Sequence, residues 1–125
     1  MAASQKTAAG GGRGALSGLK VLSLSHVVAG PLAAGLMADL GADVVHVEQP
    51  RVGDPARHLG FERDGVYVWW KVAGRNKRSV TIDLRKPEGA QLARELAAWA
   101  DVVICSIRPD TLEKWGLDWP ALQAV

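Results

Sequence analysis

Cysteine, tyrosine and phenylalanine each occur only once in the 125 residues. A single cysteine, Cys105, excludes a disulfide within the chain and provides no cysteine cluster, so we expect no metal site. Because Cys105 lies in an apolar run, we expect a buried and unreactive thiol. No apolar stretch approaches the roughly 20 residues of a membrane-spanning helix, and residues 1–14 lack the apolar core of a signal peptide. We therefore expect no membrane partner and a cytoplasmic location.

The sequence also lacks a strong excess of either charge. Its net charge is +2, and the excess comes from Lys6 and Arg13, since basic and acidic residues are equal in number from residue 15 onwards. A nucleic-acid-binding domain of this size is normally visibly basic. The composition therefore excludes nucleic acid as a partner.

Two regions differ in composition. Residues 1–14 are small, polar and rich in glycine, a composition that cannot bury a core, so we expect a disordered tail. Residues 15–125 have the composition and length of one small globular domain. The sequence stops within a segment of helical character after Asp118, so we expect this domain to be truncated at its C-terminus.

Strand-like and helix-like apolar patterns alternate along residues 15–125. A strand, a helix and a strand within about thirty residues form a βαβ unit, which requires parallel strands. The repeated cycle predicts an α/β fold with an open, mainly parallel sheet and flanking helices. The segment 49–78 is long for a loop, so it should contain structure of its own, with a short helix or an extended piece at 66–72. We expect strands at 19–24, 43–48, 79–83 and 101–105, and helices that begin at Pro31, Pro87 and Pro109.

Ligands of open α/β sheets bind at the C-terminal ends of the strands. Four segments should lie there, namely 26–30, 48–57, 83–85 and 106–108. The first turn has one glycine followed by proline, so the glycine fingerprint of dinucleotide-binding proteins is missing. Glu48 stands where such proteins keep a ribose-binding acid, but we favour an acid that either caps or forms an ion pair near a strand end.

Basic residues cluster between Lys71 and Lys86, six of them against the single acid Asp83. They would either bind the phosphates of a nucleotide-type ligand or form a solvated edge, and the sequence leaves both open.

Histidine and tryptophan supply the remaining candidates. We expect a packed or hydrogen-bonded His26 rather than a catalytic one, a His46 that packs against a helix, and a solvent-facing His58. Trp99 and Trp115 should belong to the core, and the pair at 69–70 should serve packing or an interface rather than ligand stacking.

Several motifs follow one another in an order found in a known family. They are LKVLSLSHVVAGP (19–31), LGADVVHVE (40–48), GDPAR (53–57), NKRSV (76–80) with DL (83–84), PEG (87–89), ADVV (100–103) and WGL (115–117). Together these motifs resemble the N-terminal region of the class III CoA-transferases, the family of formyl-CoA and carnitine-CoA transferases. The resemblance covers nearly everything from Ala15 onwards.

The resemblance implies a Rossmann-like large domain, of which this chain would be the N-terminal part, and an interlocked homodimer. It implies transfer of CoA from an acyl-CoA to a free carboxylic acid, with CoA and acyl-CoA as substrates and no permanently bound cofactor. An aspartate would attack the thioester and form covalent intermediates. In the family that aspartate lies downstream of the matched region, so we assign no catalytic residue and expect this chain to be inactive alone.

The resemblance also implies a set of CoA contacts. Two residues depart from the family pattern: Gln49 stands where an arginine is usual, and Ser106 where an asparagine is usual. Val28 replaces a polar side chain that contributes to substrate specificity, so we do not expect a formyl-CoA or oxalate enzyme. The implied CoA-binding residues are Val28, Ala29, Gln49, Ile82, Asp83, Leu84, Arg85, Ser106, Ile107, Arg108 and Lys114.

Other functions remain open at this point. An acyl-CoA racemase of the same family would share the fold and use a different downstream acid–base pair. A non-catalytic dinucleotide-binding module is the alternative of another class. A chain taken from an interlocked dimer would also expose apolar surface, so residues 1–125 alone should aggregate.

Overall fold

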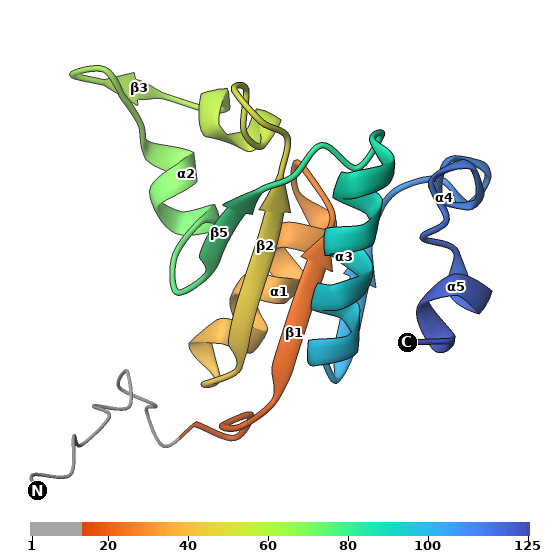
Figure 1. The fold of residues 1–125 in the computed structure, drawn as a ribbon. Helices are drawn as coiled ribbons and strands as arrows, with labels where there is room; N and C mark the ends of the chain where they lie inside the picture. Colours follow the sequence, from red (N-terminus) through yellow and green to blue (C-terminus); the bar gives the residue numbers. More distant parts are fainter. Residues whose placement is uncertain (1–13) are drawn as a thin grey trace, which may run out of the picture.

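The computed structural model describes residues 14–125. The expected tail, apart from Gly14, lies outside these described residues. Within them, β1 (Lys20–Leu24), β2 (Asp43–Glu48), β5 (Arg78–Thr81) and β6 (Val102–Cys105) form a parallel sheet in the order β5-β2-β1-β6 (Figure 1). This arrangement confirms the predicted α/β fold with a mainly parallel sheet.

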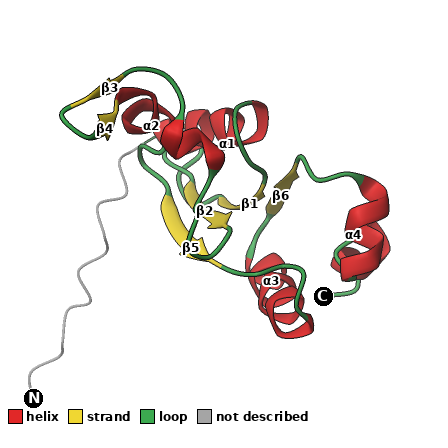
Figure 2. Ribbon diagram, turned by 90° about the horizontal axis from the view of Figure 1, so that it is seen from above, coloured by secondary structure: helices red, strands yellow, loops and turns green. Residues whose placement is uncertain are grey.

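The sheet is covered by helices on both faces, α1 (Ala29–Asp39) on one and α3 (Pro87–Trp99) on the other (Figure 2). Neighbouring side chains along a strand point to opposite faces. Val21 therefore joins the apolar cluster under α1, whereas Leu22 joins the cluster under α3. Both side chains are fully buried, which explains the nearly continuous apolar run of this central strand.

The sequence predicted that helix α1 begins at Pro31, but the helix begins two residues earlier, at Ala29. Pro31 is the third residue of the helix. It is tolerated there because the first N–H groups of a helix have no partner within the helix, so the missing N–H breaks no hydrogen bond. The residues of α1 that face the sheet are small, Ala34 and Ala38 among them, so the helix lies close to the strands.

Helix α3 begins at Pro87 as predicted. Its buried face consists of small residues such as Ala93 and Ala97, whereas the larger Leu92 is exposed. A Cβ atom at Gly89 would lie 2.0 Å from the carbonyl oxygen of Asp83. Only glycine therefore permits the close approach of α3 to the end of β5.

Helices α4 (Pro109–Trp115) and α5 (Trp119–Gln123) follow β6. Helix α4 begins at Pro109 and ends at Gly116, which has a φ of 63°, as expected for the glycine that terminates a helix. The prediction of a buried Cys105 is wrong, because this residue is exposed. It ends β6, which forms an edge of the sheet among the described residues.

The segment between β2 and β5 contains a 3₁₀ helix η1 (Pro55–His58), a small hairpin of β3 (Glu62–Arg63) and β4 (Val66–Tyr67), and α2 (Val68–Ala73). The prediction that the segment 49–78 contains secondary structure of its own is confirmed. Residues 66–72 contain both expected forms, because the strand passes directly into the helix. None of the helices in residues 14–125 is long and apolar enough to cross a membrane.

Candidate functional site

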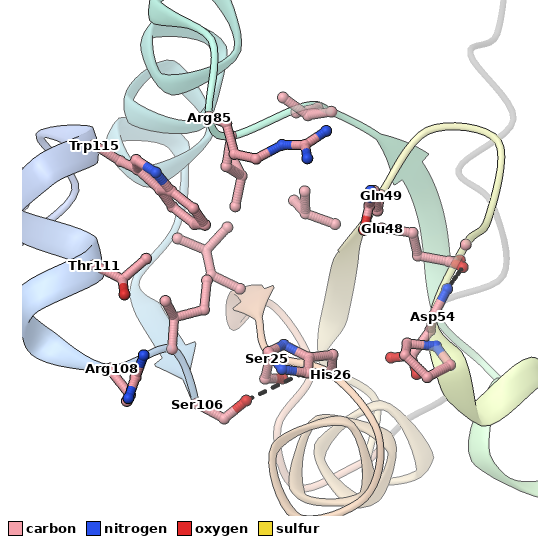
Figure 3. Close-up of a pocket in the computed structure, with 17 residues that line it drawn as sticks. Ser25, His26, Glu48, Gln49, Asp54, Arg85, Ser106, Arg108, Thr111 and Trp115 are labelled. Carbon is pink, nitrogen blue, oxygen red and sulfur yellow. Dashed lines mark hydrogen bonds between the residues drawn. The ribbon is translucent and has the colours of Figure 1, made fainter.

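A cavity of about 470 Å³ lies beyond the C-terminal ends of the strands (Figure 3). All four predicted segments contribute to it, because parallel strands bring their C-terminal ends to one edge of the sheet. Of the predicted residues, those that line the cavity are Gln49, Ile82, Leu84, Arg85, Ser106, Ile107 and Arg108.

The other predicted residues lie outside this cavity. Val28 and Ala29 begin helix α1 beside it. Asp83 accepts hydrogen bonds from the guanidinium of Arg85, at 2.8 Å from Nε, and this contact lowers the pKa of Asp83. Lys114 lines an adjoining hollow of about 430 Å³.

The adjoining hollow is rich in positive charge. Lys86, Arg94 and Lys114 line it together with Glu113. The hollow and the cavity share the lining residues Leu84, Arg85 and Trp115, so they are direct neighbours, and we refer to the two together as the recess. Trp115 packs against the buried cluster of Ala93 and Leu117, as expected for a core residue, and it also lines both the cavity and the hollow, which the sequence did not reveal.

Most of the predicted basic cluster lies elsewhere and is engaged in the fold. Arg75 pairs with Asp39 at the end of α1, and Arg78 pairs with Asp43 at 2.8 Å. Lys77 donates a hydrogen bond of 2.8 Å to a backbone carbonyl of α1. These side chains fasten β5 to its neighbours, and of the six residues only Arg85 and Lys86 line the recess.

Glu48 forms an internal ion pair and is not free to bind a ribose. Arg57 donates to both of its carboxylate oxygens, at 2.6 and 2.7 Å, and stacks on Trp70 with its guanidinium 4.2 Å from the ring centre. Burial alone raises the pKa of Glu48, but hydrogen bonds from Arg57, Ser79 and the backbone of Asp54 outweigh this effect and lower the pKa to about 2. The favoured interpretation of Glu48 as a strand-end ion pair is confirmed.

The turn between β1 and α1 is held from two sides. The backbone N–H of His26 donates to Ser106 Oγ at 3.2 Å, and the N–H of Val27 donates to Asp54 Oδ1 at 3.0 Å. His26, expected to be packed or hydrogen-bonded, is hydrogen-bonded through its backbone but is not packed, because it is exposed at the cavity. Two consecutive amides at the end of the first strand are thus occupied by side chains of this protein.

A buried chain of polar groups continues from Asp54. His46 is 1% exposed. Its Nε2 lies 3.1 Å from Asp54 Oδ2 and its Nδ1 lies 3.1 Å from Ser23 Oγ, which in turn lies 2.6 Å from Ser25 Oγ. His46 also packs against Trp70 of α2 as expected. The sequence did hold a signal for the polar chain, since Ser23 and His46 interrupt two apolar strands at paired positions.

The remaining aromatic and histidine predictions have mixed outcomes. His58 is exposed, as expected, and contacts the edge of Tyr67. Trp99 is half-buried against the core and lies beside Arg78.

In residues 14–125 no group of three histidine, cysteine, aspartate or glutamate side chains is close enough together to hold a metal ion.

Known proteins resemble this chain over most of its length. The sequence model of CoA-transferase family III matches residues 16–125. The chain is 48% identical to a succinyl-CoA–D-citramalate CoA-transferase of Chloroflexus aurantiacus, over 88% of this chain and 28% of that protein. It is 42% identical to a succinate–glutarate CoA-transferase of Agrobacterium fabrum, over 88% of this chain and 29% of the relative.

A solved structure has the same fold. The crystal structure of a CAIB/BAIF family protein from Brucella suis superimposes with a TM-score of 0.80 at 41% identity, over 89% of this chain and 30% of that one. The chain therefore spans less than a third of the length of each of these three proteins.

Proposed function

Because this chain belongs to CoA-transferase family III, we propose that it forms the CoA-binding N-terminal part of an enzyme that moves CoA from an acyl-CoA thioester to a free carboxylic acid. The observation that carries the proposal is the recess at the strand ends, where an apolar-walled cavity adjoins a hollow lined with cations. CoA has a matching division, with a phosphorylated nucleotide at one end and an uncharged arm at the other.

Arg85, Arg108 and Lys114 are the proposed phosphate ligands. CoA carries a pyrophosphate and a ribose phosphate, so it requires several cations. The side chains of Arg85 and Arg108 are 61% and 83% exposed, and Lys114 is exposed as well. These groups can therefore form charge-assisted hydrogen bonds to phosphate with a small loss of hydration.

The first βα turn supports CoA over a dinucleotide. In dinucleotide-binding folds, free backbone amides of this turn receive the pyrophosphate. Here the amide of Val27 already donates to Asp54, and Glu48 is held by Arg57. A protein carboxylate thus occupies the place of the anion, which disfavours the alternative of a dinucleotide-binding module.

We assign no catalytic residue to this chain. Asp54 borders the cavity, but it is 2% exposed and its oxygens accept hydrogen bonds from two backbone amides and His46, so it is not a free nucleophile. Asp83 is bound to Arg85. The nucleophilic aspartate that the family resemblance implies would therefore come from the remainder of the protein, and a racemase of the same family differs in that part.

Substrate and partner follow from the relatives and from the surface. Relatives that are 48% and 42% identical are named for succinyl-CoA and succinate, which supports a dicarboxylic acyl group. Exposed apolar side chains gather on the segment between β2 and β5, with Phe61 89% exposed and Val52 57% exposed. Their exposure supports a homodimer that covers this segment.

Replacement of the three cations tests the proposal. In the full-length protein, Arg85→Ala, Arg108→Ala and Lys114→Ala should each weaken inhibition by CoA by roughly tenfold to a hundredfold. Turnover should change less, because these contacts lie far from the thioester and act on binding. Inhibition constants and kcat measure both effects.

The matched control is Arg78→Ala, which removes a cation that pairs with Asp43 outside the recess. It should bind CoA like the parent protein. If all three recess variants also bind like the parent, the cations only form a solvated edge. Calorimetry with NAD and with CoA separates the dinucleotide alternative, and tight NAD binding without CoA binding would overturn the proposal.

A further inference from the structure

The turn after β1 contains an unfavourable backbone conformation. Val27 has a φ of 71°, in the left-handed region that a β-branched residue rarely adopts. A non-glycine residue populates this conformation at least roughly tenfold less than the ordinary right-handed backbone conformations. The neighbouring residues Ser25 and His26 line the cavity. The conformation of Val27 thus sets the course of the backbone at the cavity wall.

One carboxylate holds this conformation. Both oxygens of Asp54 accept the N–H of Val27, at 3.0 and 3.3 Å, and Oδ1 also accepts the N–H of Ala56 at 2.7 Å. Asp54 is 2% exposed, so water does not compete for these hydrogen bonds. The carboxylate therefore ties the β1–α1 turn to the loop that follows β2.

Asp54 is itself oriented by His46. Hydrogen bonds from His46 and from backbone amides lower the pKa of Asp54 in spite of its burial, so the carboxylate is ionised and only accepts. His46 must then donate from Nε2 to this carboxylate, and its Nδ1 lies 3.1 Å from Ser23 Oγ. Ser23 lies on β1 and His46 on β2, at paired positions of the sheet. The most rigid part of the molecule thus fixes the direction of the carboxylate.

We propose that Asp54 is a positioning residue for the CoA cavity, which holds Val27 in the left-handed conformation and is aligned for this by His46 and Ser23. The inference rests on the proposed function, because it assigns the turn to the CoA site. Asp54 itself borders the cavity, but its two carboxylate oxygens are engaged by Val27, Ala56 and His46. It acts through the backbone of Val27.

A double-mutant cycle tests this role, because glycine adopts a positive φ without strain. In the full-length protein, Asp54→Ala should weaken CoA binding by about tenfold or more, the factor that the strained conformation represents. Val27→Gly alone should stay within about threefold of the parent. The combined variant should recover most of the affinity that Asp54→Ala loses, so that the two effects are not additive.

The matched control is Asp64→Gly, which relieves another positive φ, of 53°, in the exposed hairpin. Combined with Asp54→Ala it should restore nothing. If Val27→Gly fails to rescue Asp54→Ala, or if Asp64→Gly rescues it equally, the role of Asp54 is general stability and the inference is wrong. Asp54→Asn, which retains the volume and one accepting oxygen, gives the same cycle with milder effects if the alanine variant does not fold.

A second measurement separates this inference from the proposed function. Hydrogen exchange of the Val27 amide should be slow in the parent and fast in Asp54→Ala or Asp54→Asn, with or without CoA. Equal exchange rates would overturn the inference even if CoA binds. Failure of the parent to bind CoA would overturn the proposed function, while the exchange rates still decide whether Asp54 holds the turn.

Discussion

The two sides of the cavity use their charges differently. On the β2 side, Glu48 and Asp54 are almost fully buried and are satisfied by protein groups. On the side of β5 and β6, the guanidinium groups of Arg85 and Arg108 are largely exposed. Buried charges with internal partners fix a shape, whereas exposed charges remain available to a ligand. The comparison indicates that the β2 side fixes the shape of the cavity, whereas the side of β5 and β6 attracts the anionic groups of a ligand.

The largest expected effect comes from breaking the buried side. Glu48→Gln removes the charge that binds Arg57 and should lower the free energy of unfolding at pH 7 by about 3 kcal/mol, the usual cost of breaking a buried ion pair. Denaturant unfolding of the full-length protein measures this loss. Arg78→Ala, which removes an exposed ion pair, is the control for a general effect of charge.

The pH dependence of stability sharpens the same test. The pKa of Glu48 falls from 4.5 to about 2 on folding. Its contribution is therefore present above pH 4.5 and is lost as the pH falls towards 2. Glu48→Gln should remove this part of the acid sensitivity, and a variant that loses stability over this window as steeply as the parent would contradict the assignment.

A smaller effect is expected on the exposed side. Asp83 holds the guanidinium of Arg85, so Asp83→Asn should release positive charge and strengthen CoA binding by about twofold to fivefold, as expected for an exposed ion pair. The CoA inhibition constant measures the change. A weaker affinity would instead mean that Asp83 itself contacts CoA, as the family resemblance implies.

The smallest effect should follow from a pair outside the recess. Arg78 and Asp43 are both at least half exposed, and Arg78 also lies over Trp99. Arg78→Ala should lower the free energy of unfolding by about 0.5 kcal/mol and leave CoA binding unchanged. A loss as large as that of Glu48→Gln would remove the distinction between buried and exposed pairs.

The order of the elements could be predicted from the sequence, because it depends on local patterns. The βα cycle and the helix starts at Pro87 and Pro109 depend on local signals, and the structure confirms them. The meeting of the four strand ends followed from the rule for parallel sheets. The predicted start of helix α1 was two residues too late, because proline is compatible with any position of the first helical turn.

The internal contacts of the site could not be predicted in this way. The sequence does not distinguish the members of the basic cluster. Of Arg75, Lys77 and Arg85, only Arg85 lines the recess. Their partners lie on other elements, as with Arg75 and Asp39. Likewise, the strain of Val27 depends on Asp54, a residue 27 positions away. Such pairings are tertiary, and composition does not reveal them.

The strand order also has a kinetic consequence for synthesis and folding. β1 pairs with β2 early, since both belong to one βαβ unit, but its other edge pairs with β6. His26 and Ser106, which close the cavity wall, are 80 residues apart. Contacts between distant residues form late and slow folding. During translation, the apolar edge of β1 must therefore wait until residues 102–105 of β6 have emerged, and chaperone binding is most needed in that interval.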